Sequence, residues 1–124
     1  MEQMEYTEYR QEPKIIATGT SLGYTYYVIS FGTHPCAYVE IPKGSNFFGL
    51  CEHEIPIECH GGLTYAEHRL RLVDHEGWFI GWDYAHCTDY CGFLPSVLNK
   101  KWTTNEIINE CLYVIKQLFL KEGD

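Results

Sequence analysis

The sequence predicts an α+β domain in which a mainly antiparallel β-sheet carries a C-terminal α-helix packed on one face. After Pro13, short runs of β-branched and aromatic residues alternate with brief turn-forming connections, which is typical of antiparallel hairpins. The last part of the chain instead repeats apolar residues at helical spacing. A chain of 124 residues is long enough for one domain with its own core, and short for two.

The chain divides at Pro13. Residues 1–12 are acidic and lack a sustained apolar stripe, and Pro13 ends them. We therefore expect residues 1–13 to form a mobile acidic N-terminal arm. Residues 14–124 are expected to form the single α+β domain.

Three strands are predicted in the first half of the domain. They cover Lys14–Thr20, Tyr24–Phe31 and Cys36–Ile41, where β-branched and aromatic residues are concentrated. The connections between them, residues 21–23 and 32–35, are short and contain glycine. Connections of this length favour an antiparallel meander.

The second half of the domain contains further predicted strands. Ile55–His60 is predicted as a short strand that leads into Gly61-Gly62, and Leu63–Glu67 as its continuation. Trp78–Tyr84 is the clearest strand of this half. Since side chains alternate between the faces of a strand, one face of this strand should carry Trp78, Ile80, Trp82 and Tyr84, and the other Phe79, Gly81, Asp83 and Ala85.

A C-terminal helix is predicted to begin after Thr103. Thr103 and Glu106 have the spacing of a capping box, and Trp102 and Ile107 have that of the accompanying hydrophobic staple. The residues that follow at helical spacing form one broad apolar face: Ile107, Ile108, Cys111, Leu112, Ile115, Leu118 and Phe119. We expect this face to pack on the sheet as core.

Charge and hydropathy exclude several classes of protein. Nine Lys and Arg residues against seventeen Asp and Glu residues give a formal net charge of −8, which argues against a non-specific nucleic-acid binder. No apolar run approaches the roughly 20 residues of a membrane span, and the acidic start of the chain does not resemble a signal peptide. These features predict a cytoplasmic protein with no nucleic-acid or membrane partner.

The cysteines are expected to be free thiols. No C-x-x-C pair occurs, and the closest spacing is Cys87-x-x-x-Cys91. Without an export signal, disulfides are the least favoured state of the cysteines. A zinc site is the second choice, after free thiols. Cys111 falls on the apolar helical face, where a buried thiol acts as a small hydrophobe.

A first polar cluster covers residues 59–65, Cys-His-Gly-Gly-Leu-Thr-Tyr. Gly61 and Gly62 would let the backbone approach a ligand and turn N–H groups toward an anion. His60 can donate or accept hydrogen bonds, and Thr64 and Tyr65 add hydroxyls. The alternative is a plain glycine turn whose histidine bonds to a neighbouring carbonyl.

A second polar cluster covers residues 81–90. Asp83, His86 and Asp89 recur at every third position at the end of a predicted strand, as metal ligands or an acid–base set would if the chain turns helical. Trp82 and Tyr84 offer flat surfaces for stacking. The alternative is that Asp83 caps a turn and that the other polar residues are structural or solvated.

Both clusters fall in segments that resemble an uncharacterised family of small proteins encoded by phages, bacteria and other mobile elements. The resemblance rests on GTHPCAYVEIP (residues 32–42), HGGLTY (60–65), GWFIGWDYAHCTDY (77–90) and KWTTNEII (101–108). The family pairs an HGG-(L/I)-TY motif with a later G-(F/W)-D-x-AH-x-x-D motif. The resemblance implies that the matching residues belong together: His60, Gly61, Gly62, Thr64, Tyr65, Asp83, His86 and Asp89. The pattern does not require cysteine at positions 87 or 91.

The favoured functional hypothesis is a small-molecule binding protein. A phage-borne domain of this kind would act as a counter-defence sponge in the host cytoplasm, sequestering a nucleotide-derived immune signal of the cyclic dinucleotide or cyclic ADP-ribose type. Its expected ligand-binding residues are His60, Gly61, Gly62, Thr64, Tyr65, Trp82, Asp83, Tyr84, His86 and Asp89. No cofactor is expected. The net charge of −8 repels an anionic ligand, so a local cationic pocket or an oligomer interface would have to compensate. A homo-oligomer is expected, because such sponges are commonly oligomers and the aromatic-rich surface could support one.

Two other functions stay open. In the first, the chain is a hydrolase or phosphodiesterase acting on a nucleotide or phosphate ester, with His60, Asp83, His86 and Asp89 as an acid–base set or as ligands of a divalent metal. In the second, an acidic protein mimics DNA. That hypothesis ranks last, because the acidic residues show little clustering after residue 12.

Overall fold

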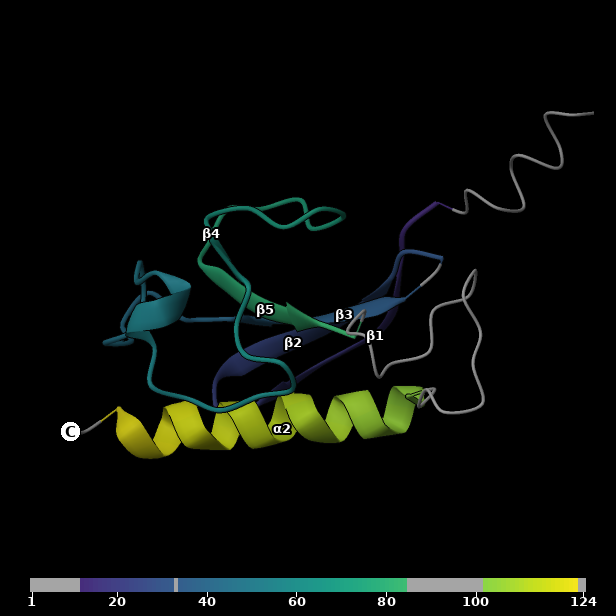
Figure 1. The fold of residues 1–124 in the computed structure, drawn as a ribbon. Coiled ribbons are helices and arrows are strands. Elements are labelled where there is room, and N and C mark those ends of the chain that lie inside the picture. Colours follow the sequence, from purple (N-terminus) through teal and green to yellow (C-terminus); the bar gives the residue numbers. More distant parts are fainter. Residues whose placement is uncertain (1–11, 33, 85–101, 123–124) are drawn as a thin grey trace, which may run out of the picture.

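The computed structural model describes residues 12–32, 34–84 and 102–122, and these are the residues treated below (Figure 1). Most of the predicted N-terminal arm therefore lies outside the described residues, as do His86 and Asp89.

A five-stranded antiparallel sheet forms one layer of the domain. Its order is β1-β2-β3-β5-β4, and every neighbouring pair is antiparallel. The strands are β1 (Lys14–Ser21), β2 (Tyr24–Ser30), β3 (Pro35–Glu40), β4 (Tyr65–Glu67) and β5 (Phe79–Asp83). The first three strands form the predicted meander, and the predicted α+β class is confirmed.

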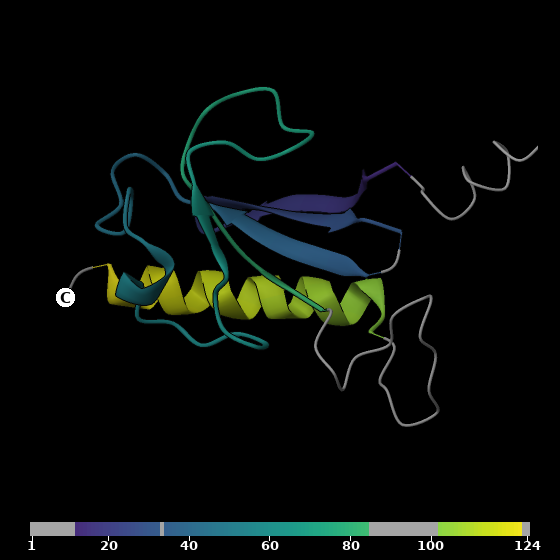
Figure 2. The same ribbon diagram turned by 45° about the horizontal axis from the view of Figure 1, so that its top comes forward.

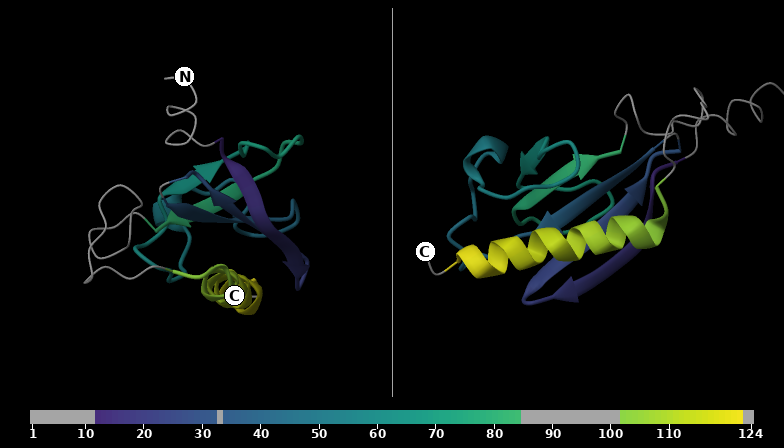
Figure 3. Two further views of the ribbon diagram at one scale, coloured as in Figure 1. Left: turned by 90° about the vertical axis from the view of Figure 1, so that its right-hand side faces the viewer. Right: turned by 60° about the horizontal axis from the view of Figure 1, so that its bottom comes forward.

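The helix α2 (Thr104–Lys121) lies across one face of the sheet, along strands β1 to β3 (Figures 2 and 3). Its N-terminus has the predicted capping box: the amide of Glu106 donates to the Thr103 hydroxyl at 3.1 Å, and the amide of Thr103 donates to the Glu106 carboxylate at 3.0 Å. These two hydrogen bonds provide acceptors for two of the four N–H groups that have no partner within the helix at its N-terminus. Within the described residues, no helix is apolar over a length that could cross a membrane.

The sheet has a hydrophobic cluster on each face. The cluster between the sheet and α2 contains Ile80, Trp82 and Tyr84 from β5 and the residue that follows it, together with the buried residues of the helix: Ile107, Cys111, Val114, Ile115 and Leu118. Phe79 belongs to the cluster on the opposite face, which we call the far face. The alternation predicted for residues 78–84 is therefore confirmed for these positions.

The connection between β4 and β5, residues 68–77, folds over the far face and is called the strap. Leu70 anchors it, because its side chain is buried in the far-face cluster. The base of the strap is closed by a hydrogen bond from the Gly77 amide to the His68 carbonyl at 3.0 Å. Figure 1 shows the strap on the side of the sheet away from α2.

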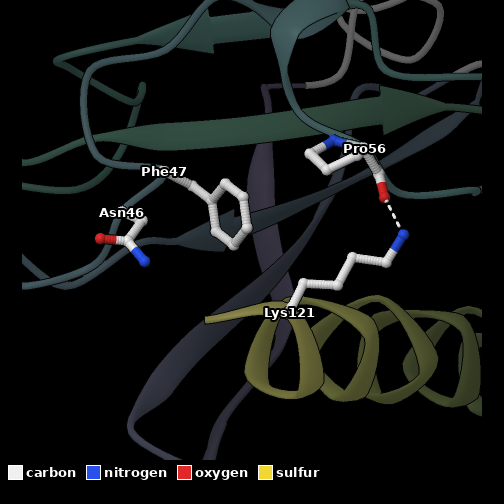
Figure 4. A pocket seen from close by; sticks show the side chains of 4 residues that line it. All are labelled: Asn46, Phe47, Pro56 and Lys121. Carbon is white, nitrogen blue, oxygen red and sulfur yellow. Dashed lines mark hydrogen bonds between the residues drawn. The ribbon is translucent and has the colours of Figure 1, made fainter. Parts of the chain in front are cut away.

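The strand predicted over residues 55–60 does not form. These residues lie along α2 instead of pairing within the sheet (Figures 1 and 2). Side chains of the helix satisfy their backbone groups. Gln117 accepts from the Glu58 amide at 2.8 Å and donates to the Glu58 carbonyl at 2.7 Å, and Lys121 donates to the Pro56 carbonyl at 2.5 Å (Figure 4). We call residues 56–60 the docked segment. Of the predicted continuation 63–67, residues 65–67 form β4.

Candidate functional site

Three aromatic rings meet where the docked segment ends. The imidazole of His60 lies flat on the ring of Tyr84, with centroids 4.7 Å apart and planes inclined by 7°. The ring of Trp102 meets that of His60 edge-on, with centroids 4.8 Å apart. It is tilted against the ring of Tyr84, with centroids 5.2 Å apart. We call His60, Tyr84 and Trp102 the His60 cluster. It joins residues from both polar motifs of the sequence to the residue that precedes the helix N-cap.

Hydrogen bonds fix two residues of the His60 cluster, His60 and Tyr84, in the fold. The amide of His60 donates to the Glu110 carboxylate on α2 at 2.9 Å, which fixes the end of the docked segment. The amide of Tyr84 donates to the Pro35 carbonyl at 3.1 Å, and its hydroxyl accepts from the indole N–H of Trp82 at 3.0 Å. Because Tyr84 is buried and hydrogen-bonded, it forms a rigid support for the half-buried His60.

The chain turns sharply at the two glycines. The amide of Gly62 donates to the carbonyl of Cys59 at 3.0 Å, which closes a turn whose third residue, Gly61, has φ +71°. A positive φ at that position is the mark of a type II turn and favours glycine. Since the Gly62 amide is used inside the turn, it does not point toward an anion, in contrast to the prediction from the paired glycines. The amide of Thr64 is also used, as a donor to the Gly81 carbonyl at 2.9 Å.

Trp82 and Tyr84, predicted as stacking surfaces, lie in the core. Each is 1% exposed, so neither ring face is open to a ligand in this structure. At the site, Tyr84 stacks against His60, and Trp82 holds Tyr84 by a hydrogen bond. The half-buried rings are those of His60 and Trp102.

Tyr65 and Asp83 lie on the far face of the sheet. Tyr65 pairs with Gly81 and packs edge-on against Tyr38 at 5.3 Å, and Asp83 pairs with Cys36. Tyr38 and Cys36 belong to the far-face cluster. The structure therefore brings His60 and Tyr84 together and places Tyr65 and Asp83 across the sheet from them.

The thiols beside the His60 cluster are held in the protonated form. Burial, reinforced by the negative charge of Glu110, raises the pKa of Cys59 to about 12. The same two causes raise the pKa of Cys111 to about 12. At neutral pH neither group is a thiolate, which is the nucleophilic form of cysteine. The four described cysteines, Cys36, Cys51, Cys59 and Cys111, are free.

Two residues of this region did not enter the predicted site. Trp102 was interpreted only as part of a helix staple, although its ring also contacts His60. Glu110 carries the amide of His60, and with Gln117 and Lys121 it holds the docked segment. The signal was present in the spacing, because polar residues at i, i+7 and i+11 share one side of a helix.

The described residues contain no set of three His, Cys, Asp or Glu side chains placed to hold a metal ion. A separate pocket of about 510 Å³ lies at the other end of α2, between Asn46, Phe47, Pro56 and Lys121 (Figure 4). None of the predicted site residues lines it. The amino group of Lys121 in this pocket donates to the carbonyl of Pro56, which belongs to the docked segment.

Comparison of the chain with protein-family models, with curated proteins and with solved structures gives no match. The resemblance to the phage and bacterial family therefore stays a prediction.

Proposed function

We propose that this chain is a small-molecule binding protein that takes a planar, nucleotide-derived ligand at the His60 cluster. One observation carries the proposal: a half-buried imidazole is stacked on a buried tyrosine and flanked by a tryptophan edge. Aromatic rings gathered beside polar groups in this way suit the base of a nucleotide.

The charge around the His60 cluster indicates which part of the ligand it would receive. Glu110 lies beside His60 and accepts its amide. A carboxylate in that place repels phosphate and attracts N–H or hydroxyl donors, so the cluster fits a base or a ribose. A cyclic dinucleotide or a cyclic ADP-ribose type of signal contains both groups. Holding such a signal unaltered would make the chain a phage counter-defence sponge.

Binding is favoured over nucleophilic catalysis by the state of the neighbouring groups. The pKa of Tyr84 is raised well above its usual value, mainly by burial, and the thiols of Cys59 and Cys111 are protonated at neutral pH. These groups are therefore packing groups and hydrogen-bond donors at the pH of a cell. Hydrolysis of the ligand is the competing outcome in the experiment below.

The proposal is tested by trapping. Purified protein is mixed with a panel of nucleotide second messengers, free compound is removed, and the protein is heat-denatured so that the released compound can be chromatographed. We expect an unaltered compound from the wild type and from His53→Ala, whose imidazole lies on an exposed turn away from the cluster. We expect His60→Ala to release little.

Other results would replace the proposal. A chemically altered compound would establish the hydrolase. If no compound is retained or altered, or if His60→Ala retains as much as the wild type, the proposed site is wrong. The thermal unfolding of each variant serves as a check that the fold is intact.

A further inference from the structure

A second groove, of about 340 Å³, lies where three segments converge. The segments are the loop after β3, the base of the strap and the start of β5. We call it the Lys43 groove, and the residues used here are Lys43, Phe48, His68, Glu76, Gly77 and Trp78. No predicted site residue lines it.

One wall of the Lys43 groove is aromatic and fixed in position. The rings of Phe48 and Trp78 pack at 6.3 Å with their planes inclined by 47°. The indole N–H of Trp78 donates to the Leu50 carbonyl at 3.0 Å, and its backbone carbonyl accepts from the Ile41 amide at 2.8 Å. Fixed rings of this kind can receive a planar group with little loss of conformational entropy.

Two basic side chains, Lys43 and His68, belong to the polar lining of the Lys43 groove. Lys43 and His68 are exposed, and neither forms an ion pair with a described residue. The one carboxylate of the lining, that of Glu76, is paired with the Arg69 guanidinium at 2.6 Å. The charge of Glu76 is thus compensated by Arg69, whereas Lys43 and His68 can contact a ligand.

We infer that the Lys43 groove binds a planar anion, an aromatic ring that bears a phosphate. The ring would lie against Phe48 and Trp78, and the phosphate would accept hydrogen bonds from Lys43 and His68. Polar groups supplied by separate segments around an apolar floor are the usual composition of a ligand site.

The Lys43 groove is distinct from the His60 cluster. Trp78 and Tyr84 stand at opposite ends of β5, and at about 3.3 Å per residue their separation along the strand is roughly 20 Å. A small ligand cannot fill both places. The inference therefore does not depend on the proposed function, and either can fail without the other.

The test uses adenosine monophosphate as the probe and amide and indole NMR resonances as the readout. We expect titration to shift the indole N–H of Trp78 and the amides of Gly49 and Gly77, which line the groove. Adenosine and inorganic phosphate should each bind at least roughly tenfold more weakly, because each supplies only half of the contacts.

A matched pair of variants tests the two basic side chains. The double variant Lys43→Gln, His68→Gln should weaken binding of adenosine monophosphate by roughly tenfold, whereas Lys14→Gln, an exposed lysine on β1, should leave it unchanged. Both substitutions of the double variant are at exposed positions, so the spectrum should stay that of the folded wild type. The inference is overturned if millimolar adenosine monophosphate shifts no groove resonance, if the shifts are confined to the His60 cluster, or if the double variant binds as well as the wild type.

Discussion

The imidazole ring of His60 lies parallel to the phenol ring of Tyr84, with 4.7 Å between their centroids. This contact joins the end of the docked segment to the end of β5, two parts of the chain that belong to different layers of the fold. Two features hold the rings together. Tyr84 is buried, and the amide of His60 donates a hydrogen bond to the Glu110 carboxylate.

Tyr84→Phe should destabilise the protein by about 1–3 kcal/mol, because the buried indole N–H of Trp82 loses its acceptor. Urea unfolding followed by circular dichroism measures the change. Tyr113→Phe is the matched control, since Tyr113 is half-exposed on the outer side of α2. An unchanged free energy of unfolding for Tyr84→Phe would show that Trp82 does not depend on this hydrogen bond.

Gln117→Ala should release the docked segment from the middle of α2. Two hydrogen bonds to the backbone of Glu58 are lost, and since both are solvent-exposed we expect about 1 kcal/mol of destabilisation. Hydrogen exchange at the Glu58 amide should become faster. Lys116→Ala, an exposed neighbour on the same helix, should leave that exchange rate unchanged. Equal exchange in the two variants would contradict the docking described here.

Gly81→Ala should be strongly destabilising. A methyl group at this position would meet the ring of Tyr38 at 2.3 Å and the Ala37 carbonyl at 2.8 Å, in the middle of the sheet. Overpacking of a core costs about 1–3 kcal/mol, and backbone contact places this site at the upper end. Gly44→Ala is the control, because nothing lies within 4 Å of the added atom. Thermal unfolding of both variants decides the matter, and equal melting temperatures would contradict the packing.

His75→Gln should reveal a pH-dependent link between the strap and the sheet. The Nε2 atom of His75 lies 3.0 Å from both carboxylate oxygens of Glu40, which also accepts the Tyr27 hydroxyl at 3.0 Å. The hydrogen bond and the charge of Glu40, with a smaller contribution from Asp74, raise the pKa of His75. Glu40 and Asp74 are thus the titratable groups in contact with this imidazole.

A raised pKa in the folded state means that the pair stabilises the protein below the unfolded pKa of histidine and that this stabilisation is lost as pH rises through the folded pKa. Wild type should therefore exceed His75→Gln in stability at about pH 5.5 and match it at about pH 9. Because half of the His75 side chain is exposed, the gain is within about 0.2–1 kcal/mol. A gap between the two proteins that is the same at both pH values would rule out the ion pair.

The features that local sequence determines were predictable. The capping box of Thr103 and Glu106 needs only four residues, and the alternation of Ile80, Trp82 and Phe79 needs only the period of a strand. The docked segment was not predictable in the same way, because a strand and a segment that docks on a helix can have the same local sequence pattern. What distinguishes them is the partner of the backbone, here Gln117, which lies 59 residues away from Glu58.

The candidate site was predicted in part. His60 and Tyr84 do meet, but the same alternation that puts Tyr84 toward α2 turns its neighbour Asp83 to the far face. A motif of adjacent residues at the end of a strand therefore cannot present all its side chains to one ligand while the chain stays extended. Separating Asp83 from His60 in advance would have required knowledge of where the chain leaves the strand. His86 and Asp89 lie outside the described residues, and their place in the site stays a prediction.

The most direct test of the central claim compares the compound released by heat from wild-type protein with that released from His60→Ala, after both have been exposed to the same panel of nucleotide signals. The account predicts one unaltered compound from the wild type, in near-equimolar amount, and at most about a tenth of that amount from the variant. Equal release from two equally folded proteins would contradict it, and would show that the His60 cluster does not hold the ligand.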